Sequence, residues 1–446
     1  MFGSAAIAMS GIVWMKTLER FLQRYTRMVL LSTGWLARTA ATTKESNVRV
    51  SRKRDTDHPT TTTTTATVAF VVSVTGCGSD PLTEGAAVLQ HSIHRASVRG
   101  QGAGMHDDLQ GRYDYDMLAI YHPEAKECAL PLAKLGYTLL ERHVLVHVED
   151  IQGDFLRQRI RQNGCCGEKE LIKLEAFTLT NYSIVVHLDL DVLVLQPLDE
   201  LFDMMLYQTH LRPGARISKS IMWPDKPLPE TINAFYTYDY NMVEPSLKAK
   251  PVQGGFLVLR PDQAVYDELR EIVKKGDFRE GSGWGGQVGP FYGSMTFQGL
   301  IPYFYDILHP GQSVELNRCI YNQMCDNPRD QRTVNDIVHG KCKTGQDECE
   351  DCRSRPLEDV VTAHFTLCQK PWGCNLHEAD IIQYRLCRKL TREWYRIRSD
   401  MEASWGRSGK GVSTKYPHDF FGYCTKRGEE GYLPIEEPYG QLASVA

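Results

Sequence analysis

Two aspartates stand one residue apart directly after an apolar run. The run is SIVVHL, residues 183–188, and Asp189 and Asp191 follow it. Residues two apart on an extended chain point to the same side, so these carboxylates repel each other unless a divalent cation neutralises them. Carboxylate oxygens suit Mg²⁺ or Mn²⁺, which keep positions open for phosphate oxygens. The pattern predicts a metal site for a phosphate-bearing substrate. A merely solvated acidic pair is the alternative, because so short a motif also arises by chance.

A later segment carries two further side chains suited to this chemistry. It is TAHFTLCQKPWGC, residues 362–374. The imidazole of His364 is a third candidate metal ligand, and the ammonium of Lys370 is suited to neutralising a diphosphate leaving group. Spacing alone does not join the two segments, and a single histidine is more often structural than a ligand.

The elements that would position the aspartates begin at residue 67. Apolar β-branched runs alternate with stretches of helical spacing, and each alternation is typical of a strand followed by a helix. The predicted strands are 67–76, 113–122, 143–148 and 183–195, and the predicted helices between them are 80–96, 130–140 and 169–182. This order indicates an α/β domain with a central, mostly parallel sheet and helices on both faces. Ligands bind at the carboxyl ends of such strands, which is where the two aspartates fall.

The second half of the chain is less regular. Residues 213–251 contain six prolines and few periodic runs, which predicts a long loop region. A strand is predicted at 254–262 and a helix at 264–276. A last helix is predicted at 378–405, with its basic residues on a solvent-exposed face, and the final thirty residues are predicted to be loosely structured.

Composition limits the classes of partner and the compartment. A net charge of -4 over 446 residues gives no electrostatic footprint for nucleic acid, so none is expected as a partner. The chain has 13 cysteines, most of them late in the sequence. Three readings are open: disulfides formed in an oxidising lumen, a zinc site around Cys349 and Cys352, and reduced thiols. Disulfides are the favoured reading.

Residues 1–66 are predicted to be a disordered targeting or stem segment. They are rich in basic residues, Ser and Thr, end in a threonine run at Thr60–Thr65, and contain two apolar stretches that are shorter than a membrane span. The composition fits a weak signal sequence followed by a stem, and it also fits an organelle transit peptide. We therefore expect the secretory pathway (Golgi or ER lumen), with an organelle or the cytoplasm as alternatives. Membrane association is expected only through this segment.

Several stretches match one enzyme family in the same order. They are AFVVSVTG, KLEAFTLTNYSIVVHLDLDVLVL, VQGGFLVLRP, TFQGL and HFTLCQKPW, and they span residues 67 to about 375. In these stretches the chain resembles glycosyltransferase family 8, the glycogenin-like group of retaining nucleotide-sugar transferases. The resemblance implies a single Rossmann-like catalytic domain of the GT-A type at 67–375, followed by a C-terminal helix and extended tail at 376–446.

The resemblance also implies an activity and a role for each matching position. The activity is transfer of a hexosyl or pentosyl group from a UDP-sugar to a carbohydrate or glycoprotein acceptor, with retention of configuration. Asp189, Asp191 and His364 match the ligands of Mn²⁺ (or Mg²⁺), and Gln298 matches a glutamine near the anomeric carbon. Positions matched to the donor are Val74, Thr75, Lys173, Asp189, Leu190, Gln253, Gly254 and Lys370, and those matched to catalysis are Gln298, Lys370 and Asp191. Without a second carboxylate as nucleophile, front-face attack by the acceptor is the expected mechanism.

Three positions depart from the family's pattern. Phe297 replaces the carboxylate of the usual DQG, Leu367 replaces a glycine, and Leu82 replaces a tyrosine that often stacks on uracil. The metal and leaving-group residues are thus retained while sugar recognition is altered. A second hypothesis is a nucleotide-sugar or glycan-binding module of the same fold that has lost turnover. In either case, the loop region 213–251 is expected to face the acceptor, because loops at strand ends set specificity.

Overall fold

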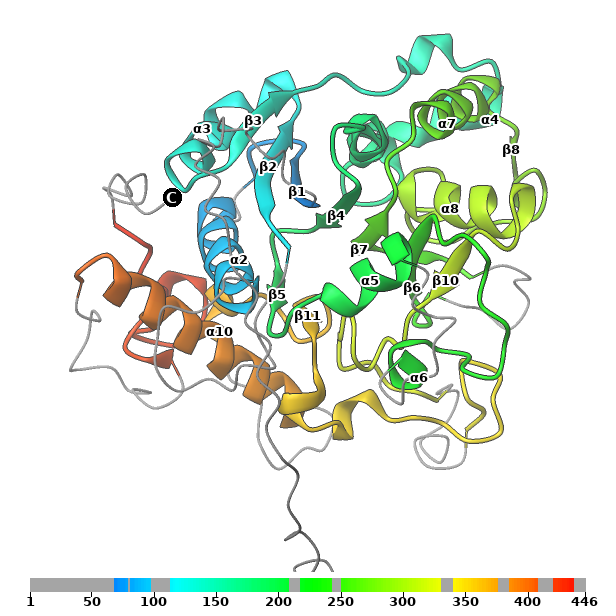
Figure 1. The fold of residues 1–446 in the computed structure, drawn as a ribbon. Helices are drawn as coiled ribbons and strands as arrows, with labels where there is room; N and C mark the ends of the chain where they lie inside the picture. Colours follow the sequence, from blue (N-terminus) through cyan, green and yellow to red (C-terminus); the bar gives the residue numbers. More distant parts are fainter. Residues whose placement is uncertain are drawn as a thin grey trace, which may run out of the picture. The chain divides into compact units, whose positions relative to one another are not determined.

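A seven-stranded sheet lies at the centre of the described chain (Figure 1). The computed structural model describes residues 68–78, 81–97, 113–207, 217–242, 250–329, 340–375, 385–407 and 420–436. The predicted targeting or stem segment, residues 1–66, lies outside them. The described residues all belong to one unit, Thr64–Ala446.

The sheet is mixed but mostly parallel, and its strand order is β10-β6-β7-β4-β1-β2-β3. Strand β7 runs antiparallel to both of its neighbours, whereas the other four pairs of neighbouring strands are parallel. The sheet strands are β1 (Val68–Val74), β2 (Tyr115–Tyr121), β3 (Thr138–Glu141), β4 (Ile184–Leu188), β6 (Ala234–Tyr238), β7 (Val252–Leu259) and β10 (Ser313–Glu315). Two short pairs complete the strands: β5 (Val192–Val194) with β11 (Thr362–His364), and β8 (Phe278–Arg279) with β9 (Gly283–Trp284).

Helices cover both faces of the sheet. Successive side chains of a strand point to opposite faces, and in these strands both sets are largely apolar, so both faces must be buried. Val68, Phe70 and Val72 of β1 pack in a core with one group of helices, while Ala69 and Val71 pack in a second core with the other group. The first group is α2 (Leu82–Ser97), α3 (Lys126–Lys134), α5 (Asp199–Tyr207) and α10 (Arg385–Ser404), and the second is α4 (Asp154–Arg159), the 3₁₀ helix η5 (Gly167–Thr178), α7 (Gln263–Lys275), α8 (Phe297–Pro302) and the π-helical turn η7 (Tyr303–Leu308). A short helix, α6, spans Ile217–Ser220. The predicted α/β class, with a mostly parallel sheet and helices on both faces, is therefore confirmed (Figure 1).

Four predicted elements differ from the structure. The strand predicted at 183–195 is divided into β4 (Ile184–Leu188), which belongs to the sheet, and β5 (Val192–Val194), which pairs with β11. The strand predicted at 143–148 is absent, and β3 is formed instead by the end of the predicted helix 130–140. The cause is Gly136, whose φ of 92° ends α3 early and turns the chain into a strand. The predicted helix 169–182 is a 3₁₀ helix ending at Thr178.

The loop region predicted at 213–251 contains one of the central strands. Its prolines flank the sequence AFYTY rather than interrupt it, so β6 forms there and lies between β7 and β10. Aromatic and β-branched residues favour a pleated, buried strand, and that preference prevails over the proline content of the surrounding chain.

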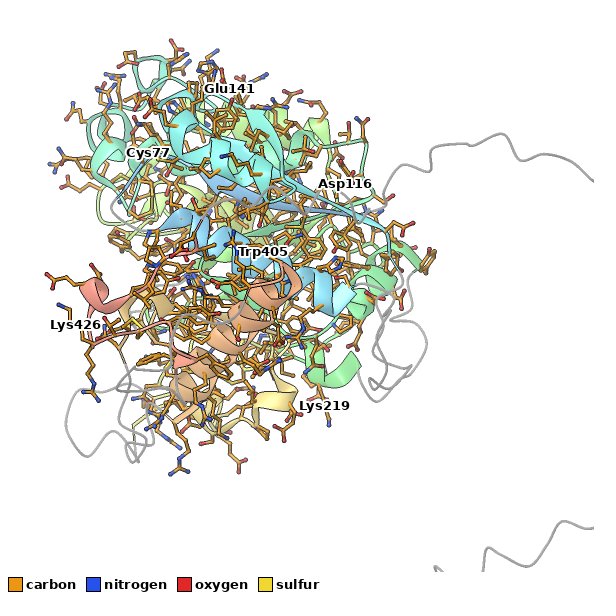
Figure 2. All side chains as sticks on the ribbon, turned by 90° about the vertical axis from the view of Figure 1, so that its left-hand side faces the viewer. Cys77, Asp116, Glu141, Lys219, Trp405 and Lys426 are labelled. Carbon is orange, nitrogen blue, oxygen red and sulfur yellow. A yellow bond between two sulfur atoms is a disulfide. The ribbon has the colours of Figure 1, made fainter. Side chains whose placement is uncertain are left out.

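The C-terminal part of the chain is more ordered and less solvated than predicted. Arg398 of α10 is fully buried rather than exposed. Its guanidinium pairs with Glu402 at 3.2 Å and with Glu84 of α2 at 3.7 Å, and it donates to the carbonyl of Leu433 at 2.7 Å. Residues 420–436 thus pack against α2 and α10, in contrast to the predicted loose structure. Figure 2 views this side of the molecule, with Trp405 just after α10 and Lys426 in the C-terminal segment.

Twelve of the 13 cysteines form disulfides, and Cys325 is a buried free thiol. The pairs are Cys77–Cys128, Cys165–Cys166, Cys319–Cys352, Cys342–Cys349, Cys368–Cys387 and Cys374–Cys424. The disulfide reading is confirmed, and the zinc reading is wrong because both cysteines proposed for it are oxidised. So many disulfides indicate an oxidising compartment. No helix among the described residues is long and apolar enough to cross a membrane.

Candidate active site

The two aspartates lie where β4 ends. All five residues of β4 are buried, and the chain leaves the sheet at Asp189, whose backbone N–H donates to the carbonyl of Gly255 at 3.1 Å. A tight turn then returns the chain to β5, with the N–H of Val192 bonded to the carbonyl of Asp189 at 3.1 Å. The apolar strand therefore delivers both carboxylates to the carboxyl end of the sheet, as predicted.

The pairing of β5 with β11 brings His364 to the aspartates. In this antiparallel pair, His364 is opposite Val192, the residue after Asp191. The next residue, Phe365, donates its backbone N–H to the carbonyl of Asp191 at 2.9 Å. A segment far along the chain is thus fixed in register with the aspartates, and the ligand atoms of Asp189, Asp191 and His364 all lie within 4.8 Å of one another.

Two nitrogen-bearing side chains contact Asp191 at this point. His364 Nε2 lies 3.2 Å from Asp191 Oδ1, and Lys370 Nζ forms an ion pair with Asp191 Oδ2. Only 8% of Asp191 is exposed. Burial alone would raise the pKa of Asp191, but His364 and Lys370 outweigh it and hold the pKa well below its usual range. Asp191 is therefore ionised at neutral pH.

Lys173 reaches the other aspartate from the opposite layer. Its side chain rises from η5, is buried, and places Nζ 2.9 Å from Asp189 Oδ1 and 3.1 Å from the carbonyl of Gly254. Glu170, one turn earlier, lies 3.7 Å from the same ammonium. Burial alone would lower the pKa of Lys173, but Asp189 and Glu170 raise it, so the ammonium stays charged.

Asp189, Asp191 and His364 fit a divalent cation. Two carboxylates and one imidazole are oxygen and nitrogen donors of the kind that hold Mn²⁺ or Mg²⁺. The second ring nitrogen of His364, Nδ1, is buried without a hydrogen-bond partner among the described residues. The ring is held against Gly255, where an added Cβ would lie 2.3 Å from His364 Cε1. The site is thus shaped around the ring of His364.

Gln298 and Gly254 lie side by side next to Lys173. Gln298 is buried in the first turn of α8, and a Cβ built on Gly254 would lie 3.4 Å from Gln298 Cγ and 3.3 Å from Lys173 Nζ. Gln253 points away from them, because its Oε1 accepts from the N–H of Gly255 at 2.6 Å and from Asn322 Nδ2 at 3.2 Å. The structure therefore brings Gln298 and Gly254 to the metal-ligand candidates, whereas the Gln253 side chain supports the backbone.

The remaining donor-binding candidates lie at the same edge of the sheet. Strands β1 and β4 are parallel with Val71 opposite His187, which places Val74 and Thr75 level with the turn after β4. The carbonyl of Val74 already accepts from the N–H of His122 at 3.0 Å. Leu190, between the two aspartates, packs in the core, and its carbonyl lies against Gly85 of α2.

The three departures from the family's pattern have different surroundings. Phe297 is fully buried, with Lys173 Nζ 5.6 Å from the centre of its ring. Leu367 is 43% exposed, and Leu82 is half-buried against the core. Phe297 thus packs beneath a charged residue of the site and supplies no polar group to it.

Sequence reasoning missed several residues that build the site. Glu170 accepts from Thr296 Oγ1 at 2.6 Å and pairs with Lys173. Asn322, with a φ of 54°, donates from Nδ2 to Gln253 and to Thr237 of β6, and its backbone N–H donates to Thr362 of β11. The spacing of Glu170 three residues before Lys173 was a usable signal. Nothing local marks Asn322.

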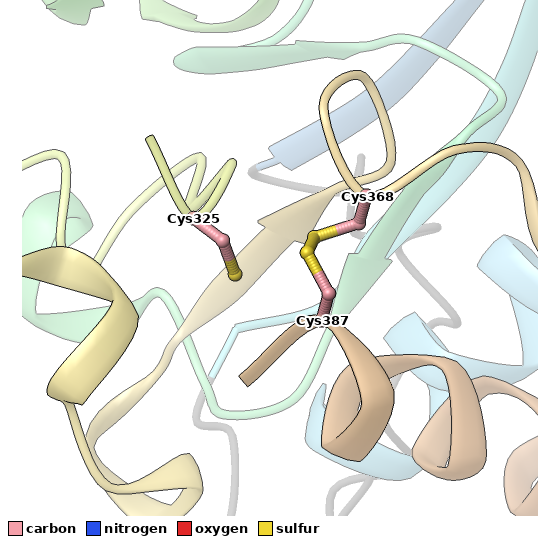
Figure 3. Close-up of side chains that lie close together, drawn as sticks. All are labelled: Cys325, Cys368 and Cys387. Carbon is pink, nitrogen blue, oxygen red and sulfur yellow. A yellow bond between two sulfur atoms is a disulfide. The ribbon is translucent and has the colours of Figure 1, made fainter. Parts of the chain in front are cut away.

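A second group of three potential metal ligands is not a metal site. The sulfurs of Cys325, Cys368 and Cys387 lie within 4.8 Å of one another, but Cys368 and Cys387 form a disulfide (Figure 3). Burial raises the pKa of Cys325 well above its usual range, so its thiol is protonated. This leaves no thiolate ligand.

Comparison with known proteins gives distant structural neighbours. No family model and no curated protein match the sequence. Mouse xyloside xylosyltransferase 1 is 12% identical, with 66% of this chain and 96% of that chain covered at a TM-score of 0.37. An active-site mutant of LgtC is 11% identical over 79% and 99% of the two chains (TM-score 0.38), and GlyE of Streptococcus pneumoniae is 12% identical over 78% and 66% (TM-score 0.37). With such low scores, the assignment of function depends on the residues of the site.

Proposed function

We propose that this chain is a metal-dependent glycosyltransferase. It transfers a hexosyl or pentosyl group from a UDP-sugar to a carbohydrate or glycoprotein acceptor with retention of configuration. The observation that carries the proposal is the meeting of Asp189, Asp191 and His364 within 4.8 Å at the carboxyl end of the sheet, with Lys370 beside them. A solvated acidic pair would not require His364 or Lys370 beside it. A departing nucleoside diphosphate, in contrast, must be neutralised by positive charge, which a bound metal ion and Lys370 would supply.

The residues divide the work between the leaving group and the sugar. When bound, Mn²⁺ or Mg²⁺ supplies a Lewis acid at the diphosphate oxygens. Asp189, Asp191 and His364 would hold that cation, and Lys370 beside Asp191 would donate to the departing diphosphate. The Cγ of Gln298 packs beside Gly254 and its Oε1 lies against Gly293. The amide of Gln298 would stabilise the developing positive charge of an oxocarbenium-like sugar. No second carboxylate is assigned as nucleophile, so the acceptor attacks from the face that the diphosphate leaves.

The other donor-binding assignments remain part of this proposal. Val74, Thr75 and Leu190 line the edge where the nucleotide would lie, and Lys173 with Gly254 would contact the donor sugar. The six disulfides support a location in the secretory pathway, in the ER or Golgi lumen. The catalytic domain is proposed to span 67–375.

A donor panel tests the proposal. UDP release is measured with UDP-glucose, UDP-galactose, UDP-N-acetylglucosamine and UDP-xylose, with Mn²⁺ and with a chelator. We expect release with at least one donor, its loss on chelation, and its loss in Asp191→Asn but not in the matched surface variant Asp225→Asn. Release that persists with the chelator or in Asp191→Asn refutes the metal assignment.

One observation favours the alternative of a binding module without turnover. Phe297 stands where the family resemblance places a carboxylate, and its burial removes that position from the site. Metal-dependent UDP binding with no release from any donor, across a broad acceptor panel, identifies this alternative.

A further inference from the structure

A separate cavity of about 440 Å³ lies beside β6 and β10 and has no role in the proposed chemistry. Strand β6 directs Tyr236 and Tyr238 to this cavity, and Thr237 to the opposite face, because side chains alternate along a strand. On that opposite face, Thr237 accepts from Asn322 Nδ2 at 2.9 Å, and Asn322 in turn contacts Gln253 near the candidate active site. The cavity thus lies on the face of β6 that is covered by α8 and η7, and α8 also carries Gln298, whereas Asn322 supports the opposite face.

Two carboxylates hold the aromatic rings around the cavity in place. Asp306 accepts from the hydroxyls of Tyr236 at 2.8 Å and Tyr238 at 2.6 Å. Glu315 accepts from Trp223 Nε1 at 2.5 Å and from the hydroxyl of Tyr240, which lies behind the cavity lining, at 2.6 Å. A carboxylate offers about four acceptor positions, so each of these retains acceptor capacity for a ligand. The rings are thus fixed before any ligand binds, which lowers the entropic cost of binding.

Two lysines balance the charge of the cavity. Lys250 Nζ lies 5.4 Å from the ring centre of Trp223 and 4.9 Å from that of Tyr240, and Lys226 Nζ lies 4.8 Å from the Trp223 ring. Lys226 is exposed, so it borders the mouth, whereas Lys250 is half-buried. Two ammonium groups and two carboxylates leave no net charge. This argues against an anion such as a phosphate and against a metal ion as the ligand.

The lining matches a ligand that has apolar faces and many hydroxyls. Aromatic rings, fixed carboxylates and ammonium groups together bind C–H faces, hydroxyl donors and hydroxyl acceptors. Tyr305 also lines the cavity, and its buried hydroxyl has no hydrogen-bond partner among the described residues. The volume falls within the roughly 300–1,000 Å³ of typical ligand pockets. We propose that this cavity is a carbohydrate-binding subsite that holds a neutral oligosaccharide part of the acceptor, an inference that rests on the proposed function.

A single helical segment connects the subsite to the candidate active site. The segment 297–308, α8 followed by η7, carries Gln298 at its start and Asp306 near its end. Eight residues of helix span about 12 Å. An acceptor held at Asp306 and Glu315 would therefore extend beyond one sugar before its reacting hydroxyl reached Gln298. The subsite would select longer glycans over single sugars.

Binding of glycans in the absence of donor and metal tests the subsite separately from catalysis. The full chain is applied to an array of neutral and sialylated oligosaccharides without UDP-sugar and with a chelator. The dissociation constant of the neutral oligosaccharide that binds best is then measured by calorimetry. We expect Glu315→Gln and Asp306→Asn to weaken binding at least about tenfold. Lys226→Ala, at the exposed mouth, is expected to weaken it about threefold while leaving the melting temperature unchanged.

The control is Asp191→Asn, which should abolish metal-dependent UDP binding and leave glycan binding unchanged. The proposal is overturned if the wild-type chain binds no neutral oligosaccharide, or if binding is unchanged in all three cavity variants. Lys226→Ala keeps the test valid if a buried variant fails to fold. Glycan binding without UDP release would support the subsite and refute the transferase proposal. UDP release without glycan binding would support the transferase proposal and refute the subsite.

Discussion

Gly255→Ala should disable the metal site without altering any ligand. The added methyl group would lie 2.3 Å from Cε1 and 2.6 Å from Nδ1 of His364, whereas carbon atoms in contact are about 3.5–4.0 Å apart. The ring would have to retreat by about 1 Å, and metal–ligand distances tolerate only about 0.2 Å. Gly255 itself does not have a positive φ, so the backbone accepts alanine.

The loss of His364 as a ligand sets the expected magnitude. Disturbing the groups that orient a ligand lowers metal affinity about 10–100-fold, and displacing the ligand itself should reach the upper end. We expect Mn²⁺ to bind about 100-fold more weakly to Gly255→Ala in the presence of UDP, about 2.7 kcal/mol. Isothermal titration calorimetry measures this directly, and the thermal midpoint without metal reports whether the fold is retained.

Two control variants make the result interpretable. Gly76→Ala, just after β1, places its methyl group in open space with no atom within 4 Å, so Mn²⁺ affinity should not change. His364→Ala removes the ring, so adding Gly255→Ala to this variant should cause no further loss of Mn²⁺ affinity. A Gly255→Ala variant that binds Mn²⁺ as tightly as the wild type would refute the placement of His364 in the metal site.

Three further predictions concern charges. Lys370→Met removes the ammonium partner of Asp191, so the affinity for Mn²⁺ alone should rise. The affinity for UDP in the presence of Mn²⁺ should fall about tenfold in calorimetry. Equal weakening of Mn²⁺ binding and UDP binding would contradict a role of Lys370 at the diphosphate. Burial lowers the pKa of His91 to about 4, so the unfolded chain, with a pKa of about 6.5, takes up this proton first as the pH falls. The free energy of unfolding should therefore fall between pH 6.5 and 4, by about 1.4 kcal/mol at pH 5.5. Urea titrations at pH 7.5 and 5.5 measure this loss, and His91→Gln should remove it. If the variant shows the same difference between the two pH values as the wild type, the assignment to His91 is wrong. Arg398→Met removes the cationic partner of the buried carboxylates of Glu84 and Glu402 and should lower the free energy of unfolding by about 3–5 kcal/mol in urea titrations. The partly exposed Arg396→Met should lower it by at most about 1 kcal/mol. Equal losses would show that burial of the ion pair is unimportant.

The parts of the fold set by local pattern could be predicted. The run before Asp189 is apolar except for His187, as a buried parallel strand requires. Both the strand and the point where it ends at the carboxylates therefore follow from the sequence. The same reasoning located β1, β2, β7 and α7, each of which is a self-contained run of one periodicity.

The parts set by tertiary pairing could not be predicted from spacing. His364 reaches Asp191 only because β11 pairs with β5 in one register, and nothing in either short segment specifies that partner. Only the family resemblance joined them. Strand β6 was hidden by prolines on both sides, and the burial of Arg398 depends on Glu84 and Glu402, which meet it only in the folded chain.

Two disulfides bracket the segment that bears Lys370. Cys368, two residues before it, is bonded to Cys387 of α10, and Cys374, four residues after it, is bonded to Cys424. Both partners are synthesised after every proposed metal ligand. The sheet and its aspartates can therefore assemble early. The segment that bears Lys370 is fixed in place only when the C-terminal segment has been synthesised and the two disulfides have formed. Maturation and redox compartment together become a condition for activity: a nascent, truncated or reduced chain would carry both aspartates but lack the fastening that holds Lys370 beside them.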